Sequence, residues 1–240
     1  MSAEVMVMLL ADARLPTGAH TQSAGLEAAL RAGMPPADVP SYIRARLLTV
    51  TAVEAGAAVV ARHRTLDAAA RTGGDDQAAA DLAVADLASA LSEVDAAWVA
   101  RTVSPALRET SVLLGRGYLR LISRLWPGSA GASAVAAMRR PGRAVAVGVA
   151  AALAGLTAEQ LVRLVAYDDV QTVAAATLKI EPLDPVVATG WVVAAADEIE
   201  RMVGDLAQLT ALNEIPAFGA PQIEQWAEIH SVTSQRLFRA

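Results

Sequence analysis

The chain has 240 residues, of which 54% are hydrophobic but only 4% aromatic, so Ala, Val and Leu supply most of its apolar surface. That length is ample for a hydrophobic core, and small aliphatic side chains favour closely packed helices. The net charge of −5 argues against a general nucleic-acid-binding protein, and the absence of Cys excludes disulfides, thiolate metal sites and Cys nucleophiles.

The N-terminal segment is a poor signal peptide, because it carries Glu4 and has no basic stretch ahead of its apolar residues. The longest uncharged apolar run, residues 144–156, is too short to cross a bilayer. We therefore expect a cytoplasmic protein that does not associate with a membrane.

Helix signals fill the first half of the chain. Ser104 is an expected N-cap, because Pro105 follows it at the first helical position. Residues 72–76 form the clearest predicted loop, with two Gly and two Asp. Apolar periodicity and start signals predict helices over residues 23–30, 35–70, 81–101 and 104–125.

Helix signals continue in the second half. Small side chains predict a helix over residues 139–156, and Thr157 with Gln160 forms a capping box that starts the next one. An Asp-Pro pair begins what we predict to be the longest helix, residues 184–209. Residues 229–240 show no clean helical period.

These elements predict an all-α fold, a single-domain bundle of roughly eight to ten helices over residues 1–228, followed by a C-terminal tail, residues 229–240. Small side chains let helices approach closely, so we expect a symmetric homodimer that uses small-residue helices such as residues 144–156. The alternative for that segment is a central helix enclosed by its neighbours.

Motifs for catalysis or cofactor binding are missing. The sole Lys, Lys179, does not lie in a phosphate-binding Gly-Lys-Ser/Thr motif, and no Gly-x-Ser-x-Gly occurs. His20, His63 and His230 are far apart along the chain, which is a poor pattern for metal ligands. We therefore predict no catalytic residue, no cofactor and no metal site, and a protein that works through binding surfaces.

The adjacent acids Asp168 and Asp169 interrupt an apolar helical segment. Neighbouring residues point about 100° apart on a helix, so the two are a poor carboxylate dyad. We expect a polar contact at a helix–helix or subunit interface. The competing hypothesis is a helical metabolic enzyme whose site joins both acids to His20 or His230.

Two surface hypotheses stay open. Arg116, Arg120 and Arg124 form a basic stripe at steps of four, which is either solvated or docks an acidic partner. Residues 144–156 are also compatible with a protein at a membrane surface, although they lack the charged face of an interfacial helix.

The opening segment, residues 15–27, resembles the start of the UreF-type urease accessory proteins, whose pattern is Leu-Pro-x-Gly followed by Ser-x-Gly-Leu-Glu. Three further segments are similar to family segments in the same order, at residues 107–121, 144–167 and 234–240. The matching positions of the opening segment are Leu15, Pro16, Gly18, Ser23, Gly25, Leu26 and Glu27.

The resemblance implies an all-α, dimeric chaperone that is not an enzyme. Members of the family bind a UreD/UreH-type accessory protein and recruit the UreG-type GTPase. The assembly delivers nickel to apo-urease. This chain departs from the family with His20 where Phe is usual, and with a rewritten ending. It therefore looks like a divergent member, and an adaptor for another maturation system is the alternative.

The resemblance also assigns roles to residues. Six are implied to be structural, with Pro16 and Gly18 shaping a turn and Ser23 capping a helix. These six are Leu15, Pro16, Gly18, Ser23, Gly25 and Leu26. Those implied to contact partner proteins are Glu27, Lys179, His230, Arg236, Leu237, Phe238 and Arg239.

The tail ends the chain after a loop with Pro and Gly, so we expect it to be mobile in the free protein and to fold against the UreD/UreH-type partner. Its apolar pair, Leu237 and Phe238, lies between Arg236 and Arg239 and suits a groove with an acidic rim. The alternative is that Leu237 and Phe238 pack on the protein's own core.

Overall fold

The computed structural model describes residues 2–71 and 77–238, and within these ranges the chain contains no strand. The first half holds α1 (Ala3–Leu10), α2 (Leu26–Arg31), α3 (Val39–Arg46), α4 (Ala52–Arg71), α5 (Gln77–Arg101) and α6 (Pro105–Leu125). The second half holds α7 (Ala130–Ala137), α8 (Arg143–Leu153), α9 (Ala158–Ile180), α10 (Pro185–Ala194), α11 (Ala196–Leu206) and α12 (Pro221–Val232). The predicted all-α fold is confirmed, and the predicted loop 72–76 lies outside the described residues.

Several helices begin at the predicted capping signals. The Ser104 hydroxyl accepts a hydrogen bond from the N–H of Leu107 at 3.1 Å, and this starts α6. Both hydrogen bonds of the Thr157–Gln160 capping box are present at the start of α9. These side chains satisfy N–H groups that have no partner inside their own helix.

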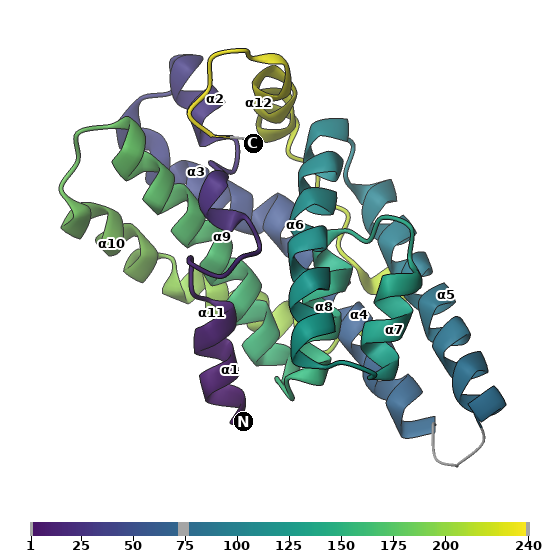
Figure 1. The fold of residues 1–240 in the computed structure, drawn as a ribbon. Helices are drawn as coiled ribbons and strands as arrows, with labels where there is room; N and C mark the ends of the chain where they lie inside the picture. Colours follow the sequence, from purple (N-terminus) through teal and green to yellow (C-terminus); the bar gives the residue numbers. More distant parts are fainter. Residues whose placement is uncertain (1, 72–76, 239–240) are drawn as a thin grey trace.

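Helix α8 is the centre of the molecule. All of its residues from Arg143 to Ala152 are buried, and α4, α6 and α7 pack around it (Figure 1). The interpretation of this segment as a central core helix is therefore confirmed, and α8 offers no surface to a second subunit or a membrane. None of the described helices combines the length and the apolar character that crossing a membrane requires.

Glycines let backbones approach closely around α8. A Cβ atom at Gly148 would lie 2.4 Å from the carbonyl oxygen of Ala58 on α4. On α6, a Cβ atom at Gly117 would lie 2.5 Å from the carbonyl oxygen of Thr17, in the loop that precedes α2. The two glycines therefore allow α4 to pack on α8 and the opening loop to pack on α6.

The other helices are arranged on both sides of this centre (Figure 1). Helix α9 packs on α4, and α10 and α11 pack on the outer side of α9. Helix α12 returns to the beginning of the chain, where it packs on α2 and α6. Segments from the two ends of the chain thus lie side by side.

The structure departs from the predicted helices in several places, and α1, α7 and α12 were not among those predicted. The longest described helix is α5, with 25 residues, because the predicted helix 184–209 divides at Ala195 into α10 and α11. Helix α10 packs on α9, whereas α11 packs on both α9 and α4. The predicted helix 35–70 contains a π-helical segment, Leu47–Thr51. At the C-terminus, residues 229–232 belong to α12 rather than to a structureless tail.

Candidate functional site

The opening segment forms a tight loop between α1 and α2. Leu15 is buried, Pro16 is exposed, and Gly18 has a φ of +94°, which favours glycine. Gly25, with a φ of +80°, is the N-cap of α2, and the Ser23 hydroxyl, two residues ahead of it, accepts a hydrogen bond from the N–H of Glu27 on the first turn at 3.5 Å. Leu26 follows and is fully buried, as a structural role requires.

Glu27, on the first turn of α2, is buried with 1% exposure and accepts hydrogen bonds from the C-terminal segment. The backbone N–H groups of Leu237 and Phe238 donate to its carboxylate at 2.7 and 3.0 Å. His230 Nε2 lies 3.0 Å from the same carboxylate, and the Arg31 guanidinium lies 2.8 Å from it. We call Glu27, Arg31, His230, Leu237 and Phe238 the Glu27 hub.

The contacts of the Glu27 hub decide the charge of its carboxylate. Burial alone would raise the pKa of Glu27, but the donors of Leu237, Phe238, His230 and Arg31 outweigh it and hold the pKa below the ordinary value of 4.5. The carboxylate is therefore ionised at neutral pH. An ionised carboxylate only accepts hydrogen bonds, so His230 Nε2 must carry the hydrogen in this contact.

The C-terminal segment packs back on its own protein. Phe238 is buried, and the Lys179 ammonium lies 5.1 Å from the centre of its ring. Lys179 also donates a hydrogen bond to the carbonyl of His20 in the opening loop. Leu237 stays 62% exposed, so the alternative of packing on the protein's own core holds for Phe238 alone.

The residues implied to contact partners therefore have different surroundings. Glu27, His230 and Phe238 are buried, whereas Lys179, Arg236 and Leu237 are exposed. Arg236 donates hydrogen bonds to the carbonyls of His230 and Ser231. Arg239 lies outside the described residues. Contact with a partner protein stays a prediction for all of them.

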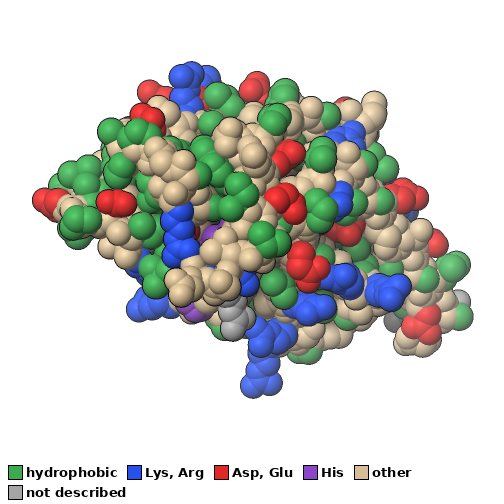
Figure 2. Space-filling model, turned by 90° about the horizontal axis from the view of Figure 1, so that it is seen from above, with side chains coloured by type: hydrophobic (Ala, Val, Ile, Leu, Met, Phe, Trp, Pro, Cys, Tyr) green, Lys and Arg blue, Asp and Glu red, His purple; other side chains and the backbone are tan. Residues whose placement is uncertain are grey.

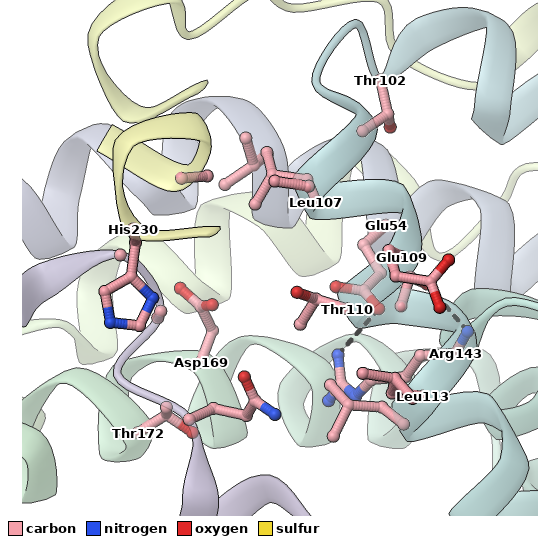
Figure 3. A pocket seen from close by; sticks show the side chains of 18 of the residues that line it. Glu54, Thr102, Leu107, Glu109, Thr110, Leu113, Arg143, Asp169, Thr172 and His230 are labelled. Carbon is pink, nitrogen blue, oxygen red and sulfur yellow. Dashed lines mark hydrogen bonds and ion pairs between the residues drawn. The ribbon is translucent and has the colours of Figure 1, made fainter. Parts of the chain in front are cut away.

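A cavity of about 300 Å³ lies beside the Glu27 hub. His230 of α12 and Asp169 of α9 lie at one end, and Glu54 of α4, Glu109 of α6 and Arg143 of α8 lie at the other (Figure 3). We call it the inner pocket. The residues that line it come from segments more than a hundred residues apart in the sequence, and folding brings these segments together.

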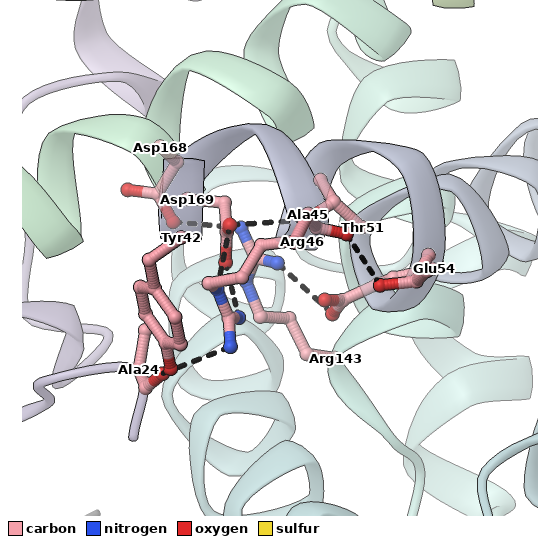
Figure 4. Close-up of polar contacts among 10 residues, drawn as sticks. Ala24, Tyr42, Ala45, Arg46, Thr51, Glu54, Arg143, Asp168 and Asp169 are labelled. Carbon is pink, nitrogen blue, oxygen red and sulfur yellow. Dashed lines mark hydrogen bonds and ion pairs between the residues drawn. The ribbon is translucent and has the colours of Figure 1, made fainter. Parts of the chain in front are cut away.

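Ion pairs form the floor of the inner pocket (Figure 4). The guanidinium of Arg46 makes a bidentate contact with the Asp169 carboxylate, at 2.6 and 2.9 Å, and donates to the carbonyl of Ala24 at 2.8 Å. The Thr51 hydroxyl donates to the same carboxylate at 2.9 Å. Although burial works to raise it, Arg46 and Thr51 hold the pKa of Asp169 below its ordinary value.

The π-helical segment Leu47–Thr51 makes this convergence possible. Residues five apart point about 140° away from each other on an α-helix with 3.6 residues per turn. A π-helix has i→i+5 hydrogen bonds and therefore brings such residues nearly above one another. Arg46 and Thr51 can then both reach Asp169.

A second group of buried ion pairs forms around Arg143. Its guanidinium lies 2.9 Å from the Glu54 carboxylate and 2.7 Å from that of Asp168, and its side chain is 6% exposed. Burial, followed by the nearby Asp169 and Glu54 carboxylates, raises the pKa of Asp168 although Arg143 opposes the shift. We call Arg46, Glu54, Arg143, Asp168 and Asp169 the buried ion-pair network.

The sequence pointed to Asp168 and Asp169 but not to their partners. The prediction of a polar contact between helices is confirmed, since their guanidinium partners come from α3 and α8. His230 lines the same pocket as both acids, whereas His20 is exposed elsewhere. Within residues 2–71 and 77–238, no three His, Asp or Glu side chains are close enough together to hold a metal ion.

Comparisons with known proteins give a consistent result. The family model described as UreF matches residues 35–196. The chain is 31% identical over 244 residues to the urease accessory protein UreF of Mycolicibacterium vanbaalenii, with 99% of each chain covered. It is 35% identical over 187 residues to that of Mycobacterium marinum, which covers 77% of this chain and 76% of the relative.

Proposed function

Because the chain belongs to the UreF family of urease accessory proteins, we propose that it is a non-enzymatic adaptor in the maturation of urease. In this role it binds a UreD/UreH-type accessory protein and recruits a UreG-type GTPase. The complex then delivers nickel, its cargo, to apo-urease. We place this activity in the cytoplasm.

One observation supports the adaptor role most directly. The two segments that carry the family resemblance at the chain ends meet at the Glu27 hub, although Glu27 and Leu237 are 210 residues apart. Leu237 and Arg236 are exposed beside it, together with Lys179. An exposed apolar side chain among cations suits a partner surface with an apolar centre and an acidic rim.

Co-purification tests this proposal. A tagged form of the chain is expected to capture the UreD/UreH-type protein, and the pair is expected to capture the UreG-type GTPase. Leu237→Asp should weaken capture, because it places a charge at the centre of the contact. The matched control Leu82→Asp changes a Leu of similar exposure, 63% against 62%, on α5. Equal capture by the two variants would show that Leu237 does not contact the partner.

A second candidate function is favoured by one observation, the presence of Asp168, Asp169 and His230 around one pocket. In a helical enzyme these groups would act as acid and base. Arg46, Arg143 and Glu27 already bind them, and this leaves them poorly placed to exchange protons with a substrate. An adaptor for another maturation system is the other alternative, and capture of a different GTPase instead of the UreG-type protein would favour it.

A further inference from the structure

Two buried polar atoms of the inner pocket have no hydrogen-bond partner within the described part of the chain. They are Nδ1 of His230 and Oε1 of Gln22, in side chains that are 2% and 7% exposed. Both residues line the inner pocket. In Figure 3 the ring nitrogen of His230 that does not contact Glu27, Nδ1, faces the interior of the pocket. A buried polar atom without a partner is costly, so a bound group that donates a hydrogen bond to either atom would be stabilised.

Both atoms are acceptors. The Glu27 carboxylate accepts from Nε2 of the His230 ring, so in the tautomer with its single hydrogen on Nε2 the Nδ1 atom offers a lone pair. The amide nitrogen of Gln22 donates to the Thr21 hydroxyl at 3.4 Å, so its carbonyl oxygen is the atom left without a partner. A ligand that satisfies both atoms must therefore carry N–H or O–H donors.

The charge of the pocket floor selects the kind of donor. The buried ion-pair network holds three carboxylates, Glu54, Asp168 and Asp169, against two guanidinium groups, Arg46 and Arg143. The network thus holds one carboxyl group more than it holds guanidinium groups, since Arg143 contacts both Glu54 and Asp168. At the rim, Glu109 is paired with Arg140, and Arg236 is exposed. A cation in the pocket would balance the network, whereas an anion would add to its excess.

The positive charges of the arginines on the pocket floor are already balanced by carboxylates, which disfavours an anion. All three side-chain nitrogens of Arg46 are occupied by Asp169 and the carbonyl of Ala24. Both terminal nitrogens of Arg143 face Glu54 and Asp168. Apolar side chains also line the pocket and suit an alkyl chain. They include Val50, Trp98, Leu107 and Leu114.

We propose that the inner pocket binds an alkyl-ammonium or alkyl-guanidinium group, whose N–H donors reach His230 Nδ1 and Gln22 Oε1 and whose charge neutralises the network. Such a group belongs either to a free small amine or to a Lys or Arg side chain that another protein inserts. This inference rests on the pocket and not on the proposed role in urease maturation.

Calorimetric titration of the full chain tests the chemistry. The probes are n-butylammonium and n-butylguanidinium chloride. Tetramethylammonium, a cation without N–H donors, and n-pentanol, a neutral chain of similar length, are the matched controls. The N–H cations are expected to bind at one site per chain, and both controls should bind at least about tenfold more weakly, as expected when hydrogen bonds to a charged group are absent.

Two variants locate the site. Gln22→Met keeps the side-chain length but removes the acceptor, so it should weaken n-butylguanidinium binding about tenfold. Thr110→Leu adds volume to the pocket wall and should abolish binding, since Thr110 lines the pocket from α6. Gln225→Met, on the exposed face of α12, is the control and should bind as the parent does. Circular dichroism confirms that each variant is folded.

Nitrogen-15 NMR gives a readout at the pocket itself. The chain has three histidines, so replacing His20 and His63 with Gln leaves the signals of His230 alone. Its Nδ1 signal should move on addition of n-butylguanidinium and stay in place with tetramethylammonium. A stationary signal, equal binding of the controls, or unchanged binding by both Gln22→Met and Thr110→Leu would overturn the proposal.

One further probe identifies the source of the cation. The peptide acetyl-Gly-Arg-Gly-amide presents the same group on a backbone. Binding of the peptide as strongly as n-butylguanidinium assigns the pocket to a side chain of another protein. Binding of n-butylguanidinium with exclusion of the peptide assigns it to a free small molecule.

Discussion

Glu27 joins the beginning of the chain to its C-terminal segment. The resemblance implied a partner contact for it, yet its carboxylate binds the protein's own C-terminal segment. Its folded pKa lies below the ordinary value of 4.5. Its contribution to stability is therefore fully present above pH 4.5 and is lost as the pH falls through the folded pKa.

The first prediction concerns this pH dependence. Glu27→Gln should lower the free energy of unfolding at neutral pH by about 1–3 kcal/mol, because buried donors lose a charged acceptor. As the pH falls from 4.5 through the lower folded pKa, the variant and the parent should converge, since the parent carboxyl becomes protonated. Urea unfolding between neutral and acidic pH measures both. Glu93→Gln, at an exposed position of α5, is the control, and a constant gap at every pH would contradict the account.

Arg143 and Arg163 give the second prediction, a comparison of a buried and an exposed ion pair. Arg143→Met leaves the Glu54 and Asp168 carboxylates buried without a counter-charge, so it should cost about 3–5 kcal/mol of unfolding free energy. Arg163→Met breaks an exposed contact with Glu200 at 2.7 Å and should leave stability nearly unchanged. Chemical unfolding of both variants checks this. Similar losses of unfolding free energy in the two variants would contradict the expected difference between a buried and an exposed ion pair.

At the scale of elements, helix α8 depends on the absence of a side chain at Gly148. Gly148→Ala should destabilise the protein by about 1–3 kcal/mol, because its Cβ atom would meet the α4 backbone and α4 or α8 must shift. Gly204→Ala in α11 is the matched control. Nothing lies within 4 Å of its Cβ position, so it should stabilise the protein by about 1 kcal/mol through helix propensity. Thermal unfolding that moves both variants in one direction would contradict this packing.

Local signals explain what the sequence predicted at this scale. Six apolar residues of the predicted helix 184–209 recur at steps of three and four and are buried or half-buried, although the chain turns at Ala195. They are Trp191, Ala195, Ile199, Met202, Leu206 and Leu209. The N-cap at Ser104 and the capping box at Thr157 formed because each needs only neighbouring residues.

Long-range contacts explain what the sequence did not predict. Arg46 and Asp169 are 123 residues apart, and nothing near Arg46 distinguishes it from a solvated arginine on an exposed helix face. The π-helical segment, which aligns Arg46 with Thr51, follows from tertiary packing and has no sequence signature of its own. The candidate site was therefore visible only through Asp168, Asp169 and the motif residues.

For the whole molecule, the expected homodimer has to use a surface other than α8. Apolar side chains are exposed on α1 and α10, among them Met8, Val186 and Val193, which are 65%, 74% and 70% exposed. Basic side chains are most frequent along the lower edge of the face in Figure 2. The exposed residues Arg116, Arg120 and Arg124 stay candidates for an acidic partner.

Light scattering tests the dimer. The full chain should scatter as a dimer at micromolar concentration, and Val186→Glu combined with Val193→Glu should shift it toward the monomer, because charges on an apolar face oppose its burial. Leu82→Glu, an exposed apolar position on α5, should leave the dimer intact. A monomeric parent chain would contradict the expected homodimer. A double variant that is still a dimer would show that the interface does not include α10.

The central claim is that this chain is an adaptor in urease maturation, and the activation of apo-urease tests it most directly. The measurement is the urease activity gained when apo-urease is incubated with nickel, bicarbonate, GTP and the UreD/UreH-type and UreG-type proteins, with or without this chain. The account predicts strong activation only when the chain is present, with loss of most of that gain for Leu237→Asp but not for Leu82→Asp. Equal activation with and without the chain would contradict it.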